Sequence, residues 1–158
     1  MPKLTQVKET KRGRYALFFD GEFAFSLDED TFAMAGLHTG DELEEWQIHD
    51  LQTKSDTRKA VDKAMDLLAL RDHAAGELYQ KLCRSFDPHS AAAAVAKMQE
   101  LNLLDDAGFA RRRAAELLRK RKSRRAILDD LHAKGIDRGA AAEAVETLFA
   151  QSEEDEEE

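Results

Sequence analysis

Apolar residues in the second half of the chain recur at helical spacing, and the pattern occurs twice. Residues 60–101 align with residues 110–151 at a shift of fifty, with one single-residue slip in between. Positions three, four and seven residues apart are typical of the buried face of a helix. The matched positions of the first copy include Ala60, Ala64, Leu67, Leu68, Leu78, Leu82, Ala91, Val95 and Met98. A repeat of this kind predicts a supersecondary unit that buries its apolar face against a neighbour, an organisation usual in binding surfaces.

Capping residues divide each copy into three helices. In the first copy Asp87 is a good N-cap and is followed by Pro88, whose missing N–H costs nothing at the first helical position. In the second copy Ser123 and Asp137 are good N-caps, and Gly135 suits the residue just after a helix. Helices this short are marginal alone, so we expect them to depend on stacking.

The first fifty residues alternate in a way that predicts strands. Two aromatic-rich segments flank Asp20-Gly21, which is a strong signal for a hairpin. The expected elements are strands at 4–7, 15–19 and 22–27, a helical turn after Asp28 ending before Gly36, and a short helix over 44–51. An isolated hairpin is barely stable in water, so these elements should pack together as one small unit.

The predicted fold class is therefore mainly α, with two tandem three-helix repeats in a solenoid-like arrangement behind a small α/β unit that contains a β-hairpin. We expect these parts to be the N-terminal α/β unit at 1–52, a polar linker at 53–56, repeat 1 at 57–104, repeat 2 at 105–151, and a disordered acidic tail at 152–158.

Composition limits the class of protein. The chain has 158 residues, of which 42% are apolar and 35% are charged, as in a highly charged globular protein. No apolar run approaches the roughly 20 residues that cross a bilayer, and the N-terminus lacks the apolar region of a secretory signal. The only cysteine, Cys83, can form no internal disulfide, which fits a reducing compartment. We expect a cytoplasmic protein with no membrane partner.

Charge is distributed unevenly along the chain. The net charge is −8, yet residues 57–152 carry 18 basic and 14 acidic side chains. Residues 111–125 hold nine basic residues and one acidic residue. The nine are Arg111, Arg112, Arg113, Arg119, Lys120, Arg121, Lys122, Arg124 and Arg125. An arginine-rich cluster of this density predicts contacts with an anionic partner, either DNA phosphate or an acidic protein surface. The alternative is a solvated helix face that only keeps the protein soluble.

Little in the sequence indicates catalysis. The five histidines show no pair at metal-ligand spacing, and the phosphate-binding and nucleophile motifs of common enzymes do not occur. Acidic runs at 28–30 and 42–45 could hold a cation weakly, which leaves an enzyme built on the N-terminal unit as one hypothesis. We predict a protein that is not an enzyme and uses no cofactor or small-molecule substrate.

Several segments, in this order, resemble the RecX family of regulatory proteins. They are ALRDHAAGELYQKL, FDPHSAAAAVAKMQELNLLDDAGFARRRA and KSRRAILDDLHAKGID, preceded by YALFFDGEFAFSLDEDTFAMAGLHTGDEL. The resemblance implies an all-helical body of three-helix repeats that lies in the groove of the RecA recombinase filament on DNA and modulates its activity. The nine basic residues would then be partner contacts, and Leu67, Leu68, Leu78, Leu82, Leu117, Leu118, Ile127 and Leu131 would be structural.

The chain departs from the family pattern in several respects, among them the number of repeats and the tail. Family members typically carry three or more repeats, whereas two are found here, and the acidic tail is not part of the pattern. We expect a regulator that binds the RecA filament and inhibits its ATP hydrolysis and strand exchange. The alternative is a helical protein that binds the nucleic-acid backbone directly and has no recombinase role.

Overall fold

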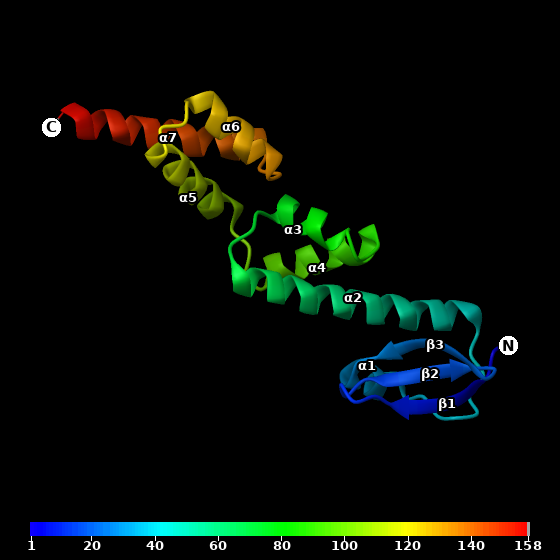
Figure 1. Ribbon diagram of the computed structural model, residues 1–158. Coiled ribbons are helices and arrows are strands. Elements are labelled where there is room, and N and C mark those ends of the chain that lie inside the picture. Colours follow the sequence, from blue (N-terminus) through cyan, green and yellow to red (C-terminus); the bar gives the residue numbers. More distant parts are fainter. Residues whose placement is uncertain (158) are drawn as a thin grey trace. The chain divides into compact units, whose positions relative to one another are not determined.

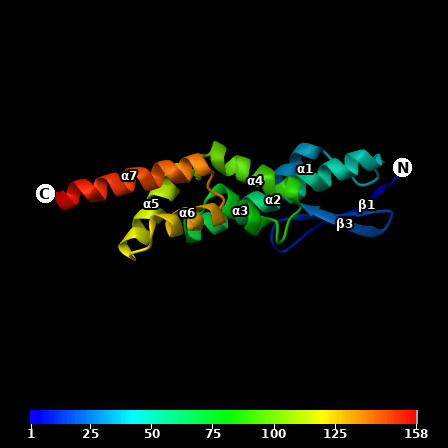
Figure 2. The same ribbon diagram turned by 90° about the horizontal axis from the view of Figure 1, so that it is seen from above.

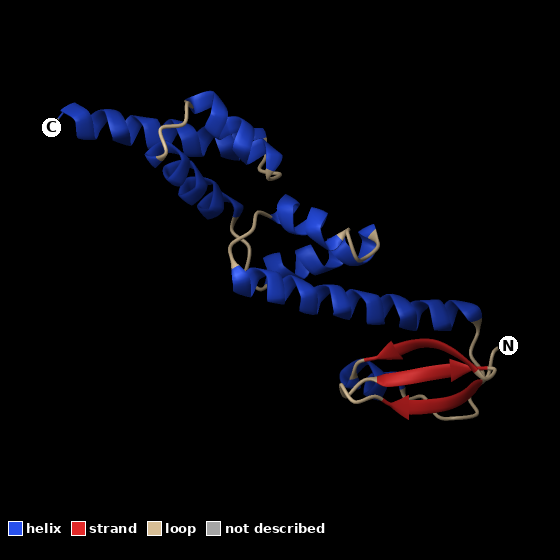
Figure 3. Cartoon of the chain, viewed as in Figure 1, coloured by secondary structure: helices blue, strands red, loops and turns tan. Residues whose placement is uncertain are grey.

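The computed structural model describes residues 1–157, with the side chains of residues 1–153. It is mainly helical, with a small antiparallel sheet near the N-terminus (Figures 1 and 3). The strands are β1 (Leu4–Glu9), β2 (Tyr15–Phe19) and β3 (Glu22–Leu27), and the helices are α1 (Glu29–Ala35), α2 (Glu45–Leu70), α3 (Ala75–Leu82), α4 (Pro88–Glu100), α5 (Asp106–Arg119), α6 (Arg124–Ala133) and α7 (Arg138–Glu157). The chain forms two compact units, residues 1–60 and residues 61–158.

The sheet of the first unit is a meander in the order β1-β2-β3. Leu17 at its centre is paired with Val7 on β1 and with Phe25 on β3. Asp20 and Gly21 both have positive φ, 51° and 83°, as the two central residues of a tight hairpin turn of this type require. The predicted hairpin is therefore confirmed.

The core of the first unit lies on one face of this sheet. Side chains from β1, β2 and β3 pack there with residues that follow α1, and the buried set is Leu4, Leu17, Phe19, Phe25, Leu27, Leu43 and Leu51. Asp28 caps α1 by accepting a hydrogen bond from the Thr31 N–H at 3.2 Å. The ring of Phe32 on α1 stacks on that of Tyr15, with 4.3 Å between centroids. The apolar residues that alternate along the strands and those of the helical segments thus pack into one core.

The predicted linker at 53–56 is helical instead. It lies within α2, which joins the expected short helix at 44–51 to the expected first helix of repeat 1. The segment contains neither glycine nor proline, so nothing in it interrupts a helix. Ser55 is fully buried, and its hydroxyl donates to the Ser26 carbonyl at 2.5 Å. Polar composition here marks a helix that contacts an edge strand, and not a flexible connection.

The second unit contains the repeated helices. α3 packs against α4, while α5, α6 and α7 pack against one another (Figures 1 and 2). The core of the α5–α7 group is formed by Phe109, Ala110, Ala114, Leu117, Ile127, Leu131, Ile136, Ala141, Ala144 and Val145. Leu117, Ile127 and Leu131 are thus buried as predicted, and Leu78 and Leu82, the counterparts of Ile127 and Leu131, are buried as well. Leu67, Leu68 and Leu118 are only half-buried, at the margin of the helix faces.

The capping residues lie where the sequence predicts them. Asp87 accepts from the Ser90 N–H at 3.1 Å, with Pro88 beginning α4. Asp137 accepts from the Ala140 N–H at 2.9 Å at the start of α7. The predicted disordered tail differs from the structure, because α7 continues through residue 157. Glutamate is a good helix former and no glycine or proline intervenes. The last position, 158, lies outside the described residues.

Candidate partner-binding surface

Helix α5 carries the first part of the basic stretch and has a buried side and an exposed side. The buried positions are Gly108, Phe109, Ala110, Ala114 and Leu117. Arg111, Arg112 and Arg119 are exposed on the other side. Asp105 begins the helix by accepting a hydrogen bond from the Gly108 N–H at 3.1 Å. The helical period therefore places most of the arginines of α5 in solvent.

The turn between α5 and α6 has a defined geometry. The Lys122 N–H donates to the Leu117 carbonyl at 3.0 Å, and the Arg121 N–H donates to the Leu118 carbonyl at 2.8 Å. This pair of hydrogen bonds is the Schellman motif that ends many helices. Ser123 then caps α6 by accepting from the Ala126 N–H at 3.1 Å. Four consecutive bases, residues 119–122, are thereby held on an ordered corner.

Arg121 occupies a position in this motif that normally belongs to glycine. Its φ is 62°, in the left-handed region, where a side chain costs about 1 kcal/mol or more. α4 and α6 end with the same pair of hydrogen bonds, but with Asn102 and Gly135 at that position. Asparagine and glycine tolerate the left-handed region well. An arginine there is a local departure from the best choice for stability.

One of the predicted contact residues, Arg113, is engaged within the protein. Its Nε and second guanidinium nitrogen bind the two carboxylate oxygens of Asp130 on α6, at 2.9 and 3.1 Å. It also contacts Glu116 at 3.2 Å. The hydrogen bond from Arg113 lowers the pKa of Asp130, and the same bond raises the pKa of Arg113. This half-buried pair joins α5 to α6.

Three further bases of the stretch are paired at the surface. Arg112 contacts Asp72 at 3.1 Å, and Lys120 contacts Glu116 at 3.3 Å. Arg124 contacts Glu146 at 3.6 Å and lies 4.9 Å from the centre of the Phe149 ring. Such exposed pairs are weak and exchange readily with a partner. Of the nine bases at 111–125, those without an ion-pair partner among the described residues are Arg111, Arg119, Arg121, Lys122 and Arg125.

We call the exposed bases at the α5–α6 turn the basic corner. They are Arg119, Lys120, Arg121, Lys122, Arg124 and Arg125. The turn lies at the end of α5 that points away from α3 and α4 (Figures 1 and 2). The structure therefore brings six of the nine predicted residues together on one projecting turn. Arg111 and Arg112 lie towards the other end of α5, and Arg113 faces α6.

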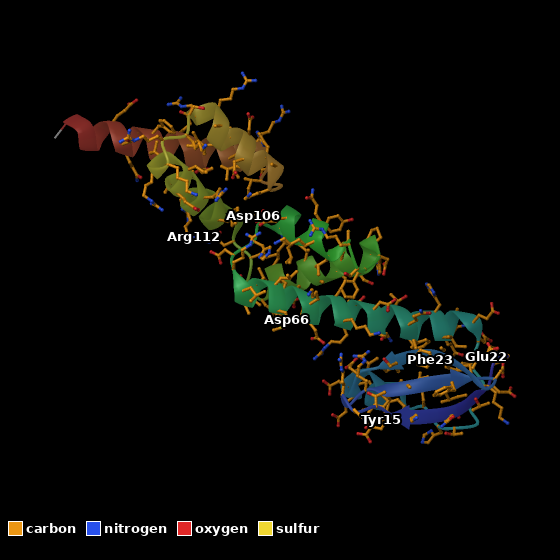
Figure 4. All side chains as sticks on the ribbon, viewed as in Figure 1. Tyr15, Glu22, Phe23, Asp66, Asp106 and Arg112 are labelled. Atoms are coloured by element: carbon orange, nitrogen blue, oxygen red, sulfur yellow. The ribbon has the colours of Figure 1, made fainter. Side chains whose placement is uncertain are left out.

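The two repeats form a junction that the sequence pattern did not predict. Ala74 precedes α3 and has no side chain that can cap it, so the Ala75 N–H is capped by Asp106 from α5, at 2.8 Å. Figure 4 shows Asp106 beside the start of α3. A Cβ added to Gly76 would lie 2.9 Å from the Cα of Gly135. The missing cap at Ala74 was the signal that could have indicated a neighbour here.

A buried histidine lies beside this junction. His73 is 3% exposed, its Nδ1 is 2.8 Å from the Arg71 carbonyl, and its Nε2 is 2.9 Å from the Lys81 ammonium. Since an ammonium only donates, Nε2 is the acceptor and Nδ1 carries the proton. Burial lowers the pKa of His73, and the positive charges of Lys81 and Arg71 lower it further. The ring is therefore a neutral structural group.

A hollow of 330 Å³ opens next to the junction, but its charges are already neutralised. The cations that line it are Arg71, Arg112, Arg113 and Lys134. Arg71 is paired with Glu77 at 2.9 Å, and Lys134 is 3.9 Å from Asp130. Because Arg112 and Arg113 are paired as well, unpaired positive charge gathers at the basic corner and not in this hollow.

The described residues contain no group of three or more His, Cys, Asp or Glu side chains arranged to hold a metal ion. The acidic runs of the first unit thus do not converge on a cation site within that part of the chain. Among the same residues, no helix has the length and apolar character needed to cross a membrane.

The fold and this surface define a tandem three-helix-repeat protein with a small sheet ahead of the repeats and a basic corner on the second repeat. The chain is a relative of the RecX regulatory proteins, with similarity along almost its whole length. Regulatory protein RecX of Caldanaerobacter subterraneus subsp. tengcongensis is 27% identical over 149 residues, which are 94% of this chain and 76% of that protein. RecX of Lactobacillus gasseri is 31% identical over 158 residues, 99% of this chain and 57% of that protein.

A solved structure shares the fold. The crystal structure of a regulatory protein RecX superposes with a TM-score of 0.69 at 24% identity, covering 94% of this chain and 74% of the other. No family model matches the chain. The chain spans 57% of the Lactobacillus relative and 58% of RecX from Bacillus subtilis. The resemblance seen in the sequence is confirmed by these comparisons.

Proposed function

We propose that this protein binds the RecA recombinase filament on DNA and inhibits its ATP hydrolysis and strand exchange, in recombination and DNA repair. It acts by binding and not by catalysis. The kinship with regulatory proteins named RecX supports a regulatory role. The stacked repeats support a binding surface, because repeat folds present extended faces to their partners.

One observation carries the proposal: the basic corner concentrates positive charge that the protein itself does not use. Arg119, Arg121, Lys122 and Arg125 are exposed and have no ion-pair partner among the described residues. Arg121 in addition holds a left-handed conformation in which glycine is more stable. Strain retained at an exposed charged residue suggests that the charge serves a partner. A recombinase filament on DNA offers both acidic protein surface and phosphate.

A second candidate is direct binding to the nucleic-acid backbone without a recombinase role. The same six bases favour it. Lysine and arginine side chains that neutralise phosphates release the counterions bound there, which gives affinity for nucleic acid of any base sequence. Both candidates predict binding that weakens steeply with salt. They differ in whether the protein changes the recombinase at concentrations where bare DNA is little occupied.

The rate of DNA-dependent ATP hydrolysis by RecA, with the protein titrated at fixed moderate salt, tests the proposal. We expect inhibition at less than one protein per recombinase subunit. Reversing three bases of the basic corner, R119E/R121E/K122E, should abolish it. The matched control K63E/R84E/R138E reverses three exposed bases of the same unit outside the corner, none of which is paired among the described residues. Unchanged hydrolysis together with ordinary DNA binding would favour the second candidate.

A further inference from the structure

The starts of α3 and α6 are counterparts in the two repeats. Ala74 and Ser123 are the N-cap residues of these helices, which makes Ala75 the counterpart of Arg124 and Gly76 the counterpart of Arg125. The buried residues four positions after each cap, Leu78 and Ile127, agree with this assignment. Any surface that the first repeat forms with these residues therefore has an equivalent on the second repeat.

In repeat 1 this surface receives a neighbouring helix. The carboxylate of Asp106, the first residue of α5, accepts from the Ala75 N–H at 2.8 Å. The side chain of Ala74 is fully buried within the apolar core of repeat 2. Arg112, six residues further along α5, is paired with Asp72 at 3.1 Å. The surface thus seats a helix whose first turn carries a carboxylate.

In repeat 2 the equivalent surface has lost its apolar character and gained charge. Ala69, Leu70 and Asp72 of the first copy are replaced by Arg119, Lys120 and Lys122 in the second. Ala75 and Gly76 are likewise replaced by Arg124 and Arg125. Five residues with a single negative charge among them are thus replaced by five bases, which together with Arg121 form the basic corner.

The contacts that satisfy repeat 1 have no equivalent in repeat 2. Arg71 is paired with Glu77 at 2.9 Å, but the counterpart of Glu77 is Ala126, and Arg121 has no ion-pair partner among the described residues. The Arg124 N–H has no acceptor in the described chain, whereas its counterpart at Ala75 is capped by Asp106. The surface is built like the occupied one but offers unused donors and unused charge.

We propose that the basic corner seats an acidic protein segment of the partner, a helix with carboxylates in its first turn, in the place that α5 occupies on repeat 1. This inference rests on the proposed function and names what the corner contacts. Carboxylates are common in the first turn of helices, where the macrodipole favours them. Arg125 in place of Gly76 prevents the close backbone approach seen between the repeats. Long guanidinium side chains then make the contact in place of backbone packing, with two-pronged hydrogen bonds to carboxylate.

Carbodiimide cross-linking of the full chain to the recombinase filament on DNA tests the inference. The reagent joins an ammonium to a carboxylate and does not join it to an internal phosphodiester. Lys122 is exposed and unpaired within the described residues, so we expect an amide from Lys122 to an Asp or Glu at the start of a recombinase helix. K122R should remove this cross-link. Cross-links confined to lysines outside the basic corner, or ultraviolet cross-links from the corner to DNA alone, would overturn the inference.

Co-sedimentation with the same filament separates the two proposals. R119E/R121E/K122E should bind at least tenfold more weakly than the unaltered chain, while K63E/R84E/R138E should change binding less than twofold, with native circular dichroism for both. A filament that does not retain the unaltered chain would refute the proposed function and this inference together. Retention that the corner variant leaves unchanged would refute the docking of the acidic segment alone.

Discussion

Gly76 on α3 and Gly135 after α6 meet backbone to backbone where the two repeats join. A Cβ built on Gly76 would lie 2.9 Å from the Cα of Gly135, and one built on Gly135 would lie 2.8 Å from the Cα of Gly76. Both distances are shorter than a Cβ tolerates, and the obstructing atoms belong to the backbone. The two glycines are therefore required by one contact between residues 59 positions apart in the chain.

Alanine at either glycine should destabilise the protein. At Gly76 overpacking costs about 1–3 kcal/mol, of which the better helix propensity of alanine returns up to about 1 kcal/mol. At Gly135 the loss should be larger, because its φ of 84° adds about 1 kcal/mol of backbone strain. Urea unfolding of each variant measures the loss in the free energy of unfolding. Gly139→Ala is the control, since it meets only the Asp137 carboxylate at 3.3 Å and should be neutral or stabilising. Equal stability of all three variants would refute the contact.

The ion pair between Arg113 and Asp130 should contribute to stability, unlike the exposed bases nearby. Arg113→Ala leaves a half-buried carboxylate without its two hydrogen bonds, which should cost about 1–3 kcal/mol. Arg119→Ala should change the free energy of unfolding by less than about 0.5 kcal/mol, because Arg119 is exposed and unpaired within the described chain.

Acid should remove the contribution of this pair. The hydrogen bond from Arg113 holds the pKa of Asp130 below its usual 3.8, so the folded state binds fewer protons than the unfolded state. The stabilisation is present above pH 3.8 and is lost as the pH falls through the lowered pKa. The free energies of unfolding of Arg113→Ala and of the unaltered chain should therefore become equal in acid. A constant difference between them down to pH 2 would contradict the assignment.

His73 should make stability depend on pH in a higher range. Burial, with Lys81 and Arg71 nearby, lowers its pKa below the usual 6.5, so the unfolded state binds more protons near that value. The contribution is complete above pH 6.5 and is lost as the pH falls through the lowered pKa. Thermal unfolding from pH 7.5 to pH 5 should show this loss. His73→Gln should flatten the profile, whereas His89→Gln, at an exposed position, should leave it unchanged.

Glycine in place of Arg121 should raise stability and weaken partner binding. It relieves the left-handed strain of an arginine at φ 62°, a gain of up to about 1 kcal/mol, and removes one charge of the basic corner. Asn102→Gly makes the same backbone change at the end of α4, where φ is 58°, without touching the corner. We expect it to stabilise slightly and to leave recombinase inhibition as it is. Reduced inhibition by Asn102→Gly would show that stability, and not charge, sets the effect.

Local signals in the sequence were enough to predict most elements. Asp20-Gly21 between aromatic strands predicted the hairpin, and Asp87-Pro88, Ser123 and Asp137 predicted the starts of three helices. These signals depend on backbone conformations and hydrogen bonds within a few residues, which neighbours in sequence decide. The prediction of a linker at 53–56 was wrong because a polar segment can be either a linker or the surface of a helix. Which of the two it forms depends on contacts with residues distant in the sequence.

The sequence by itself determined the repeat, the type of each element, the apolar faces and the concentration of bases at residues 111–125. Only the tertiary structure decided which of those bases are available: Arg113 turns to Asp130, while Arg121 and Lys122 stay unpaired within the described residues. It also decided that Asp106 caps α3 and that Gly76 meets Gly135. The physical reason is the distance along the sequence over which each interaction acts. A helical period fixes the side of a helix on which a residue lies, but a partner tens of residues away is chosen by how the helices pack.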